Sequence, residues 1–201
     1  MTSRSTELVS FLRTLNEFLV PRVSGNAQKL VGRIDRKLAF PGQTKGPARI
    51  SPPLVCTHLF PALTDAANSD SQLSPLVNEL RTLEPSLVWR PRTAGAGASA
   101  NFLNDHANAM IIGPGGIEER SDVWIGLSLL APGTRYPDHN HAPSEVYLVL
   151  SPGEFKQAGG AWFSPGVGKT FYNSPGILHA MRSTPDEPLL ALWLLDVERE
   201  E

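Results

Sequence analysis

The spacing of apolar residues divides the chain into two parts of different character. In the first part, apolar residues recur every three or four positions, which is the period of one helix face. One such stripe follows a candidate N-cap at Ser5 and comprises Leu8, Phe11, Leu12, Leu15, Phe18 and Leu19. A second comprises Leu30, Val31, Ile34 and Leu38, and a third comprises Leu76, Val77, Leu80 and Leu83. Ser74-Pro75 precedes the third stripe and favours a helix start there. We therefore predict a helical extension over residues 1–99, with a loop at 41–53.

The second part begins after a segment of small residues at 93–100. Beyond it, runs of apolar and β-branched residues are short, and Gly and Pro interrupt them often, as is typical of strands and turns. The predicted strands are residues 109–112, 123–130, 145–150, 154–155, 161–163, 169–172, 179–182 and 189–195. Strands of this length and spacing predict an all-β sandwich or barrel over residues 100–201.

Composition excludes several classes of protein. The chain has 201 residues and a net charge of -2, so its charge does not indicate nucleic acid or an anionic membrane as a partner. The basic residues of the helical part show no helix-turn-helix pattern. No run reaches the roughly 18 apolar residues of a membrane span, and the start is not a secretory signal. The single cysteine, Cys56, excludes an internal disulfide and fits a reducing compartment. We expect a cytoplasmic protein.

Candidate metal ligands are concentrated in two short segments of the second part. His139 and His141 stand two residues apart, Glu145 and Tyr147 follow, and His179 lies in a second turn-strand segment. Residues two apart in a strand point to the same face, so these side chains can converge inside a barrel. A single histidine in a strand is usually a surface or hydrogen-bonded residue, but this grouping favours a metal site. His58 and His106 lack such neighbours, and we interpret them as structural or peripheral.

Imidazole and carboxylate suit several transition metals: iron, zinc, manganese, nickel, cobalt and copper. We predict one such ion per chain, with iron preferred. Because the imidazoles must be neutral to bind, affinity should fall at low pH.

The two segments resemble the motifs of the cupin superfamily. The first motif is matched at Gly133, His139, His141 and Glu145, with its closing glycine one residue late at Gly153. The second is matched less closely: the fitting positions are Gly168, Gly176 and His179, whereas Pro175 is displaced by one place and Ser183 stands where asparagine is usual. The resemblance implies a mainly β fold, a jelly-roll-like cupin barrel with an N-terminal helical extension.

Within that superfamily, the chain most resembles the bacterial cupin-type lyases that cleave dimethylsulfoniopropionate, of the DddQ type. The continuous stretch from Tyr136 to Leu148, the Pro-Gly-Glu-Phe that ends at 155 and the helical extension carry this resemblance. It implies that His141, Glu145 and His179 bind the metal, with Tyr147 on it or beside it. His139 is either a further ligand or a residue that orients the ligands.

Such a lyase removes a proton next to the substrate carboxylate and expels dimethyl sulfide, leaving acrylate. We predict Tyr147 as the base, because it lies two residues from Glu145 and a nearby cation favours the phenolate. Tyr136 is predicted as a second acid–base group or a substrate gate. Aromatic faces attract a sulfonium cation; the candidates are Trp124, Trp162, Trp193, Phe163 and Tyr172.

Two other functions stay open. A cupin dioxygenase with iron would use the same ligands and consume oxygen, which elimination does not. A non-enzymatic ligand-sensing cupin would hold a structural metal or none. The expected partner is a small zwitterionic substrate, dimethylsulfoniopropionate, with no nucleic acid and no membrane. Because edge strands of an open barrel invite pairing, we also expect a homodimer.

Overall fold

The computed structural model describes residues 3–44 and 51–197, so the predicted loop at 41–53 lies partly outside the described residues. Its α-helices are α1 (Thr6–Leu19), α2 (Gly25–Leu38), α3 (Leu59–Ser69) and α4 (Ser74–Leu83). Short 3-10 helices join them: η1 (Leu54–His58), η2 (Ser71–Leu73) and η3 (Glu84–Ser86). All these helices precede residue 100, as the sequence predicts.

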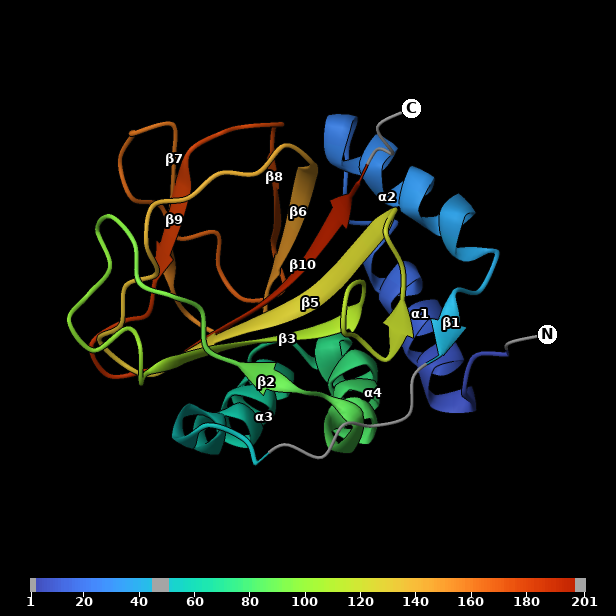
Figure 1. Cartoon of the computed structure of the whole chain (residues 1–201), viewed down its shortest axis with the longest axis horizontal. Helices are drawn as coiled ribbons and strands as arrows, with labels where there is room; N and C mark the ends of the chain where they lie inside the picture. Colours follow the sequence, from blue (N-terminus) through green and yellow to red (C-terminus); the bar gives the residue numbers. More distant parts are fainter. Residues whose placement is uncertain (1–2, 45–50, 198–201) are drawn as a thin grey trace.

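The strands of the described chain form two sheets. They are β1 (Gln43–Thr44), β2 (Trp89–Arg90), β3 (His106–Ile112), β4 (Glu118–Glu119), β5 (Val123–Leu130), β6 (Ser144–Val149), β7 (Glu154–Gln157), β8 (Thr170–Asn173), β9 (His179–Arg182) and β10 (Leu189–Asp196). The larger sheet runs β1-β4-β3-β5-β10-β6-β8, with β2 also paired to β3. The smaller sheet contains β7 and β9. Figure 1 shows β7 and β9 standing apart from the larger sheet.

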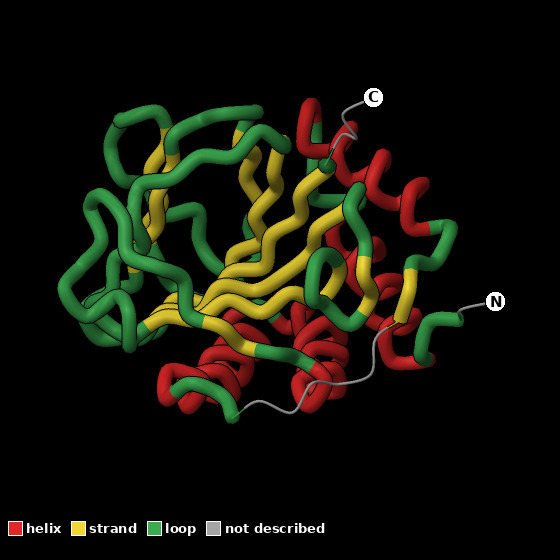
Figure 2. Tube along the Cα trace, in the orientation of Figure 1, coloured by secondary structure: helices red, strands yellow, loops and turns green. Residues whose placement is uncertain are grey.

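The helices cover one face of the larger sheet (Figure 2). Their apolar stripes supply the reason, because burying such a stripe against a sheet removes it from water. In α1, Leu8 and Phe11 are fully buried, and Ser5 caps the helix by accepting the Leu8 N–H. Side chains of α1 to α4 and of β3, β5, β6 and β10 share one hydrophobic core. The predicted cap and the three predicted helices are therefore confirmed.

Helix α3 was not predicted from the sequence. Its buried positions are Leu59, Ala62, Leu63 and Ala66. Two of these four are alanines, whose small side chains give little contrast with polar neighbours, so the helical period is hard to read. The helix that starts at Ser74-Pro75 has the predicted beginning.

Most predicted strands are confirmed, and those at 123–130 and 179–182 have the predicted bounds. The strand predicted at 161–163 is wrong. Only Phe163 forms a bridge there, to Phe155, because Gly160 and Pro165 closely bracket the segment and leave no room for a ladder. The two-residue strands β1, β2 and β4 were too short to predict. The division into parts at residues 99 and 100 stays a prediction; β1 and β2 of the first part pair with β4 and β3 of the second.

The space between the two sheets has its own apolar cluster. It contains Phe102, Leu130, Tyr136, Tyr147, Val149, Phe155, Met181, Leu189 and Ala191. Two tyrosines of the predicted site are thus in this interior, on the side of the larger sheet away from the helices.

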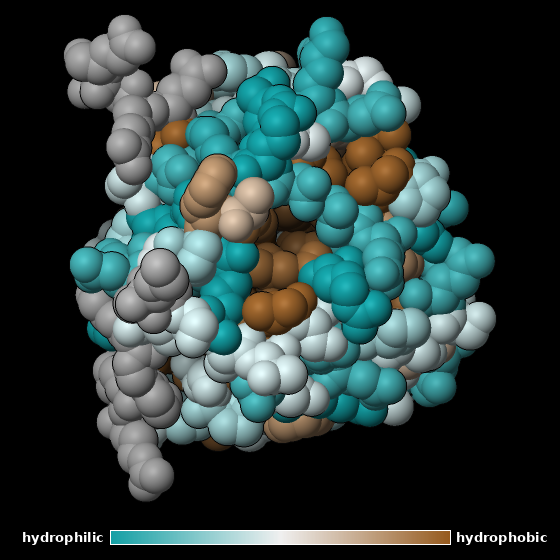
Figure 3. All heavy atoms as spheres, turned by 90° about the vertical axis from the view of Figure 1, so that its right-hand side faces the viewer, coloured by the Kyte–Doolittle hydropathy of each residue, from teal (hydrophilic) through white to brown (hydrophobic). Residues whose placement is uncertain are grey.

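A groove about 450 Å³ in volume runs between α1 and α2. Its apolar lining includes Leu12, Leu15, Val31, Ile34 and Leu38. Figure 3, which faces this side of the molecule, shows apolar atoms in a hollow surrounded by hydrophilic ones. No helix of the described ranges has both the length and the apolar composition that crossing a membrane requires.

Buried ion pairs tie the helical layer to the sheet. Glu118 of β4 is fully buried and accepts hydrogen bonds from Arg4 (Nε, 2.5 Å), from the Gly42 N–H (2.9 Å) and from Arg120 (3.3 Å). Burial alone would raise the pKa of Glu118, but these donors lower it overall. Glu118 therefore stays ionised in the folded protein at neutral pH.

A second group of ion pairs joins α2 to β10. Asp196, at the end of β10, is buried and accepts hydrogen bonds from Lys37 Nζ (2.6 Å) and from Arg33 Nε. Its pKa follows the same pattern: burial would raise it, and the two cations of α2 lower it.

We predict that Glu118→Gln lowers the free energy of unfolding by about 3 kcal/mol, because it removes the carboxylate that pairs with the largely buried Arg4 and one of the two carboxylates beside Arg120. Urea unfolding at neutral pH measures this. The control is Glu17→Gln, which removes an exposed pair with Arg13 and should cost less than about 0.5 kcal/mol. Equal losses in the two variants would contradict the prediction.

The same variant should change the acid sensitivity of the protein. Folding lowers the pKa of Glu118. The stabilisation that the ionised Glu118 gives the folded state is therefore fully present above the pKa of glutamate in the unfolded chain, near 4. It is lost as the pH falls through the lower folded value. Glu118→Gln should accordingly flatten the fall of stability with decreasing pH in this range.

Candidate metal centre

Three predicted ligands meet where the two sheets face each other. His141 precedes β6, Glu145 is in β6 of the larger sheet, and His179 begins β9 of the smaller one. Ligand atoms of these three residues all lie within 4.8 Å of one another. The Glu145 carboxylate oxygen Oε2 is 3.3 Å from the Nε2 atoms of both His141 and His179. Three of the predicted site residues therefore form one compact cluster.

Backbone carbonyls orient both imidazoles. His141 Nδ1 is 2.8 Å from the Pro143 carbonyl oxygen, and His179 Nδ1 is 2.9 Å from that of Ile177. This assigns the proton to Nδ1 and leaves a lone pair on Nε2, the arrangement found in metal-binding histidines. Both Nε2 atoms are buried and lack a hydrogen-bond partner. Unpaired buried nitrogens beside a carboxylate fit a bound cation.

The charges of the cluster also suit a cation. Glu145 is almost fully buried, which by itself would raise its pKa, but the two histidines lower that pKa to about 2. Burial would lower the pKa of His141, yet its contact with Glu145 raises it overall. The carboxylate is therefore ionised over the whole physiological range, and its contact with His141 favours a proton on that imidazole, which a cation at Nε2 would displace.

His139 lies beside this cluster but outside it. Its backbone pairs with that of His179, with N–H to carbonyl distances of 3.0 and 2.9 Å, and its ring centroid is 4.0 Å from that of His179. Burial, and next the proximity of His179, lowers the pKa of His139 to about 4. His139 is thus neutral at pH 7. Its role as a ligand stays a prediction, and its backbone clearly helps to hold His179.

A cavity of about 360 Å³ opens onto the cluster. His139, His141 and Glu145 line it, together with Tyr136 and Tyr147. Tyr147 is buried, and its pKa is raised well above 10 by burial and then by the charge of Glu145. Both predicted catalytic tyrosines therefore line one cavity with His139, His141 and Glu145.

Two polar residues missed by sequence reasoning hold the Tyr136 hydroxyl. Asn108 Nδ2 of β3 donates to it at 2.9 Å, and Arg92 Nη1 donates at 3.3 Å. The Arg92 N–H donates in turn to His106 Nε2 at 2.7 Å, so the buried His106 has the structural role that was predicted. Asn108 could have been recognised in the sequence as a candidate site residue, because it is a polar residue within an otherwise apolar strand. No sequence pattern indicated Arg92.

The aromatic candidates for the sulfonium separate into two groups. Trp124 and Trp193 line the cavity. Among the described residues, the other three candidates are not part of the cavity lining. Trp162 lies under Arg182, with the guanidinium 4.3 Å from its ring centroid. Phe163 joins the apolar cluster between the sheets, and Tyr172 packs against the helical core.

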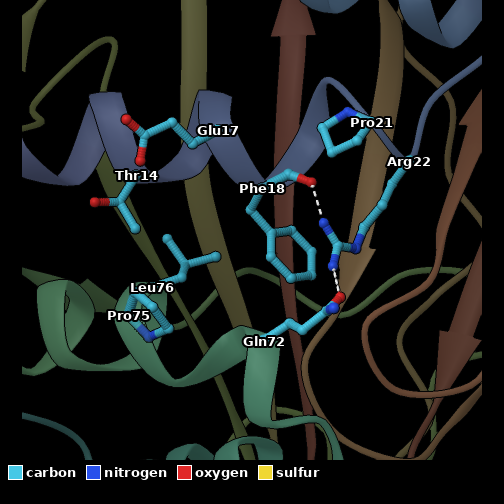
Figure 4. Close-up of a pocket in the computed structure, with 8 residues that line it drawn as sticks. All are labelled: Thr14, Glu17, Phe18, Pro21, Arg22, Gln72, Pro75 and Leu76. Carbon is cyan, nitrogen blue, oxygen red and sulfur yellow. Dashed lines mark hydrogen bonds between the residues drawn. The ribbon is translucent and has the colours of Figure 1, made fainter.

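A second hollow lies on the surface between α1 and α4 (Figure 4). Its main cation, Arg22, donates to the Phe18 carbonyl at 2.7 Å and also to Gln72. The Arg22 guanidinium lies 3.7 Å from the centre of the Phe18 ring. No histidine lines this hollow, so the chemistry described above has no counterpart there.

The sequence also matches a known family. Residues 26–191 match the profile of the dimethylsulfoniopropionate lyase family. The chain belongs to this family. The matched range contains His141, Glu145 and His179 and most of the residues that line the cavity, and the predicted resemblance is confirmed.

Individual relatives agree with this assignment. The chain is 31% identical over 113 residues to dimethylsulfoniopropionate lyase DddQ of Ruegeria pomeroyi; this alignment spans 55% of the chain and 56% of the relative. The crystal structure of DddQ from Ruegeria pomeroyi DSS-3 superposes with a TM-score of 0.65 and 21% identity, covering 96% of this chain and 94% of that one. A crystal structure from a study of the lyases RdDddP and RnDddQII superposes with a TM-score of 0.64 and 20% identity. The superposition covers 94% of this chain and 92% of that one.

These two structures are 20% and 21% identical in sequence to this chain, so their similarity shows a shared fold. It extends over the helices as well as the sheets, because coverage exceeds nine-tenths of the chain. The predicted fold class, a cupin with an N-terminal helical extension, is confirmed.

We predict that Zn²⁺ affinity falls as the pH decreases from about 8 to about 5. A proton and a metal compete for His141 Nε2, whose pKa is raised, so affinity should fall roughly tenfold per pH unit for each proton displaced. Glu145, with a pKa of about 2, stays ionised throughout. Competition with a coloured chelator measures the affinity. Constant affinity over this range would show that the imidazoles are not ligands. His58→Ala, remote from the cluster, is the control and should match the wild type.

Proposed function

We propose that this protein is a metal-dependent carbon–sulfur lyase that cleaves dimethylsulfoniopropionate to dimethyl sulfide and acrylate. Family membership over residues 26–191 carries the proposal. The cluster of His141, Glu145 and His179 supports it, since these residues offer the donor atoms that a catalytic metal requires. The alignment with DddQ of Ruegeria pomeroyi spans about half of that protein and agrees with this activity.

The reaction is a β-elimination. A base takes a proton from the carbon next to the carboxylate, the electron pair forms the carbon–carbon double bond, and the carbon–sulfur bond breaks to release neutral dimethyl sulfide. A metal held by His141, Glu145 and His179 would bind the substrate carboxylate, stabilise the developing negative charge and favour an ionised phenol nearby.

Tyr147 is the proposed base. It follows Glu145 by two residues in β6, so its side chain faces the same interior, and it lines the cavity. Without a cation the pKa of Tyr147 lies well above 10, so its hydroxyl is protonated at neutral pH. Tyr147 can act as a base only when a positive charge beside it lowers this pKa. Turnover should therefore depend strictly on metal.

Tyr136 is the proposed second acid–base group. Its hydroxyl oxygen accepts hydrogen bonds from Asn108 and Arg92. With both lone pairs of the oxygen accepting from these donors, its O–H is left to donate to a group in the cavity. Tyr136 can thus give a proton at a fixed position and take it back.

Trp124 and Trp193 are the proposed contacts of the sulfonium, because they line the same cavity as the cluster and an indole face attracts a cation. The Trp193 ring packs over Gly126, where an added Cβ would lie 2.4 Å from ring carbons. Its Nε1 donates to Ser128 Oγ at 3.1 Å. The ring is therefore held in one position against the strand.

The proposed function predicts that the purified protein, loaded separately with each candidate metal, releases dimethyl sulfide and acrylate in equal amounts. Gas chromatography and NMR measure the two products, and an oxygen electrode should record no oxygen consumption. Absence of dimethyl sulfide with every metal would refute the substrate assignment. Oxygen uptake coupled to turnover would instead favour the dioxygenase alternative.

Replacing Tyr147 by Phe should lower kcat by at least about 100-fold, the scale of a lost general base, while the bound metal content stays unchanged. Tyr136→Phe should lower kcat less. The third tyrosine of the chain provides a matched control: Tyr172→Phe removes a hydroxyl outside the cavity lining and should leave kcat unaltered. Undiminished turnover in Tyr147→Phe would exclude Tyr147 as the base.

Iron is proposed as the native metal, to be checked by metal analysis of protein purified without added ions. The homodimer and the cytoplasmic location remain predictions.

A further inference from the structure

We propose that Asn173, held in place by Gln157, is a positioning residue that fixes the Glu145 carboxylate for metal binding. This inference deepens the proposed function and rests on it for the role of the metal in turnover.

The three side chains form a continuous hydrogen-bonded chain. Asn173 Nδ2 donates to Glu145 Oε2 at 2.8 Å, and Gln157 Nε2 donates to Asn173 Oδ1 at 2.6 Å. Gln157 Nε2 also donates to the Tyr172 carbonyl oxygen at 2.8 Å. Asn173 is fully buried and Glu145 nearly so, so water does not replace these bonds readily.

The Tyr172 carbonyl fixes the orientation of both side-chain amides in this series of hydrogen bonds. The Tyr172 carbonyl can only accept, so Gln157 must present its NH₂ group there and toward Asn173. Asn173 must then turn its oxygen to Gln157 and its NH₂ group to Glu145. A backbone carbonyl thus determines, through two amides, which atom faces the metal-site carboxylate.

The chain also links the two sheets at the level of the cluster. Asn173 pairs directly with Glu145 across β8 and β6, and Gln157 pairs directly with His179 across β7 and β9. The contact between Gln157 and Asn173 therefore joins the strand pair that carries Glu145 to the strand pair that carries His179.

A neutral amide suits this position for a chemical reason. It donates to the carboxylate without neutralising it, so the negative charge remains available for a cation. An arginine or lysine there would compete with the metal. Residues that orient metal ligands in this way typically contribute 10- to 100-fold in metal affinity.

The experiment measures Co²⁺ binding to the full-length, metal-free protein, with no substrate present. Gln157→Ala and Asn173→Ala should weaken Co²⁺ affinity about 10- to 100-fold and alter the visible d–d absorption of bound Co²⁺. Gln157→Glu should be as damaging as Gln157→Ala despite its similar size. The new carboxylate would attract the Asn173 NH₂ group and turn its oxygen toward Glu145.

Lys156→Ala is the matched control. Lys156 neighbours Gln157 in β7, and its Nζ lies 6.0 Å from the Trp162 ring centroid, away from the chain of amides. This variant should bind Co²⁺ with wild-type affinity and spectrum. Because Gln157 is only partly buried, its variants should fold even if Asn173→Ala does not, and thermal melts of the metal-free proteins establish this.

Unchanged Co²⁺ affinity and spectrum in the folded Gln157 variants would overturn the inference, whatever the enzymatic activity. Failure of the wild-type protein to bind Co²⁺ would overturn it as well. A wild-type protein that binds Co²⁺ but releases no dimethyl sulfide, with weakened binding in the Gln157 variants, would instead refute the proposed substrate and uphold the positioning role.

Discussion

The site depends on an ionised carboxylate, Glu145, held between two sheets with two imidazole nitrogens 3.3 Å away. A buried carboxylate is costly unless donors or cations compensate it. Here the compensation comes from the Asn173 amide, from a proton on His141 Nε2 or, in the proposed function, from a metal that takes the place of that proton. The backbone carbonyls of Pro143 and Ile177 orient the two imidazoles so that both Nε2 atoms face this carboxylate.

The rest of the fold supports this arrangement through packing and ion pairs. Apolar stripes of the helices cover the far face of the larger sheet, while buried ion pairs at Glu118 and Asp196 fix the helical layer to the edge and the end of strands. The segment between the helices and the barrel also contributes directly, because Arg92 reaches the Tyr136 hydroxyl. The extension therefore shapes the cavity as well as stabilising the sheet.

The sequence predicts the structure correctly where the information is local. The helix stripes, the cap at Ser5 and the strand at 123–130 depend on residue spacing within one element. The grouping of His141, Glu145 and His179 was predicted because their motifs are short and distinctive. Helix α3 is not evident from the sequence, because its buried alanines obscure the helical period. The strand predicted at 161–163 is absent, because the flanking Gly and Pro leave only a single bridge there.

The sequence by itself determined which chemical groups are present and which elements carry them: two imidazoles, a carboxylate and two tyrosines on or beside strands of a β structure. The tertiary structure alone decided which neighbours these groups have. Gln157 and Asn173 are distant in sequence from His179 and Glu145, respectively, and they become their partners only through strand register. Arg92 reaches the cavity because its backbone N–H is bonded to His106. Such pairings arise between distant segments, and no local pattern of residues encodes them.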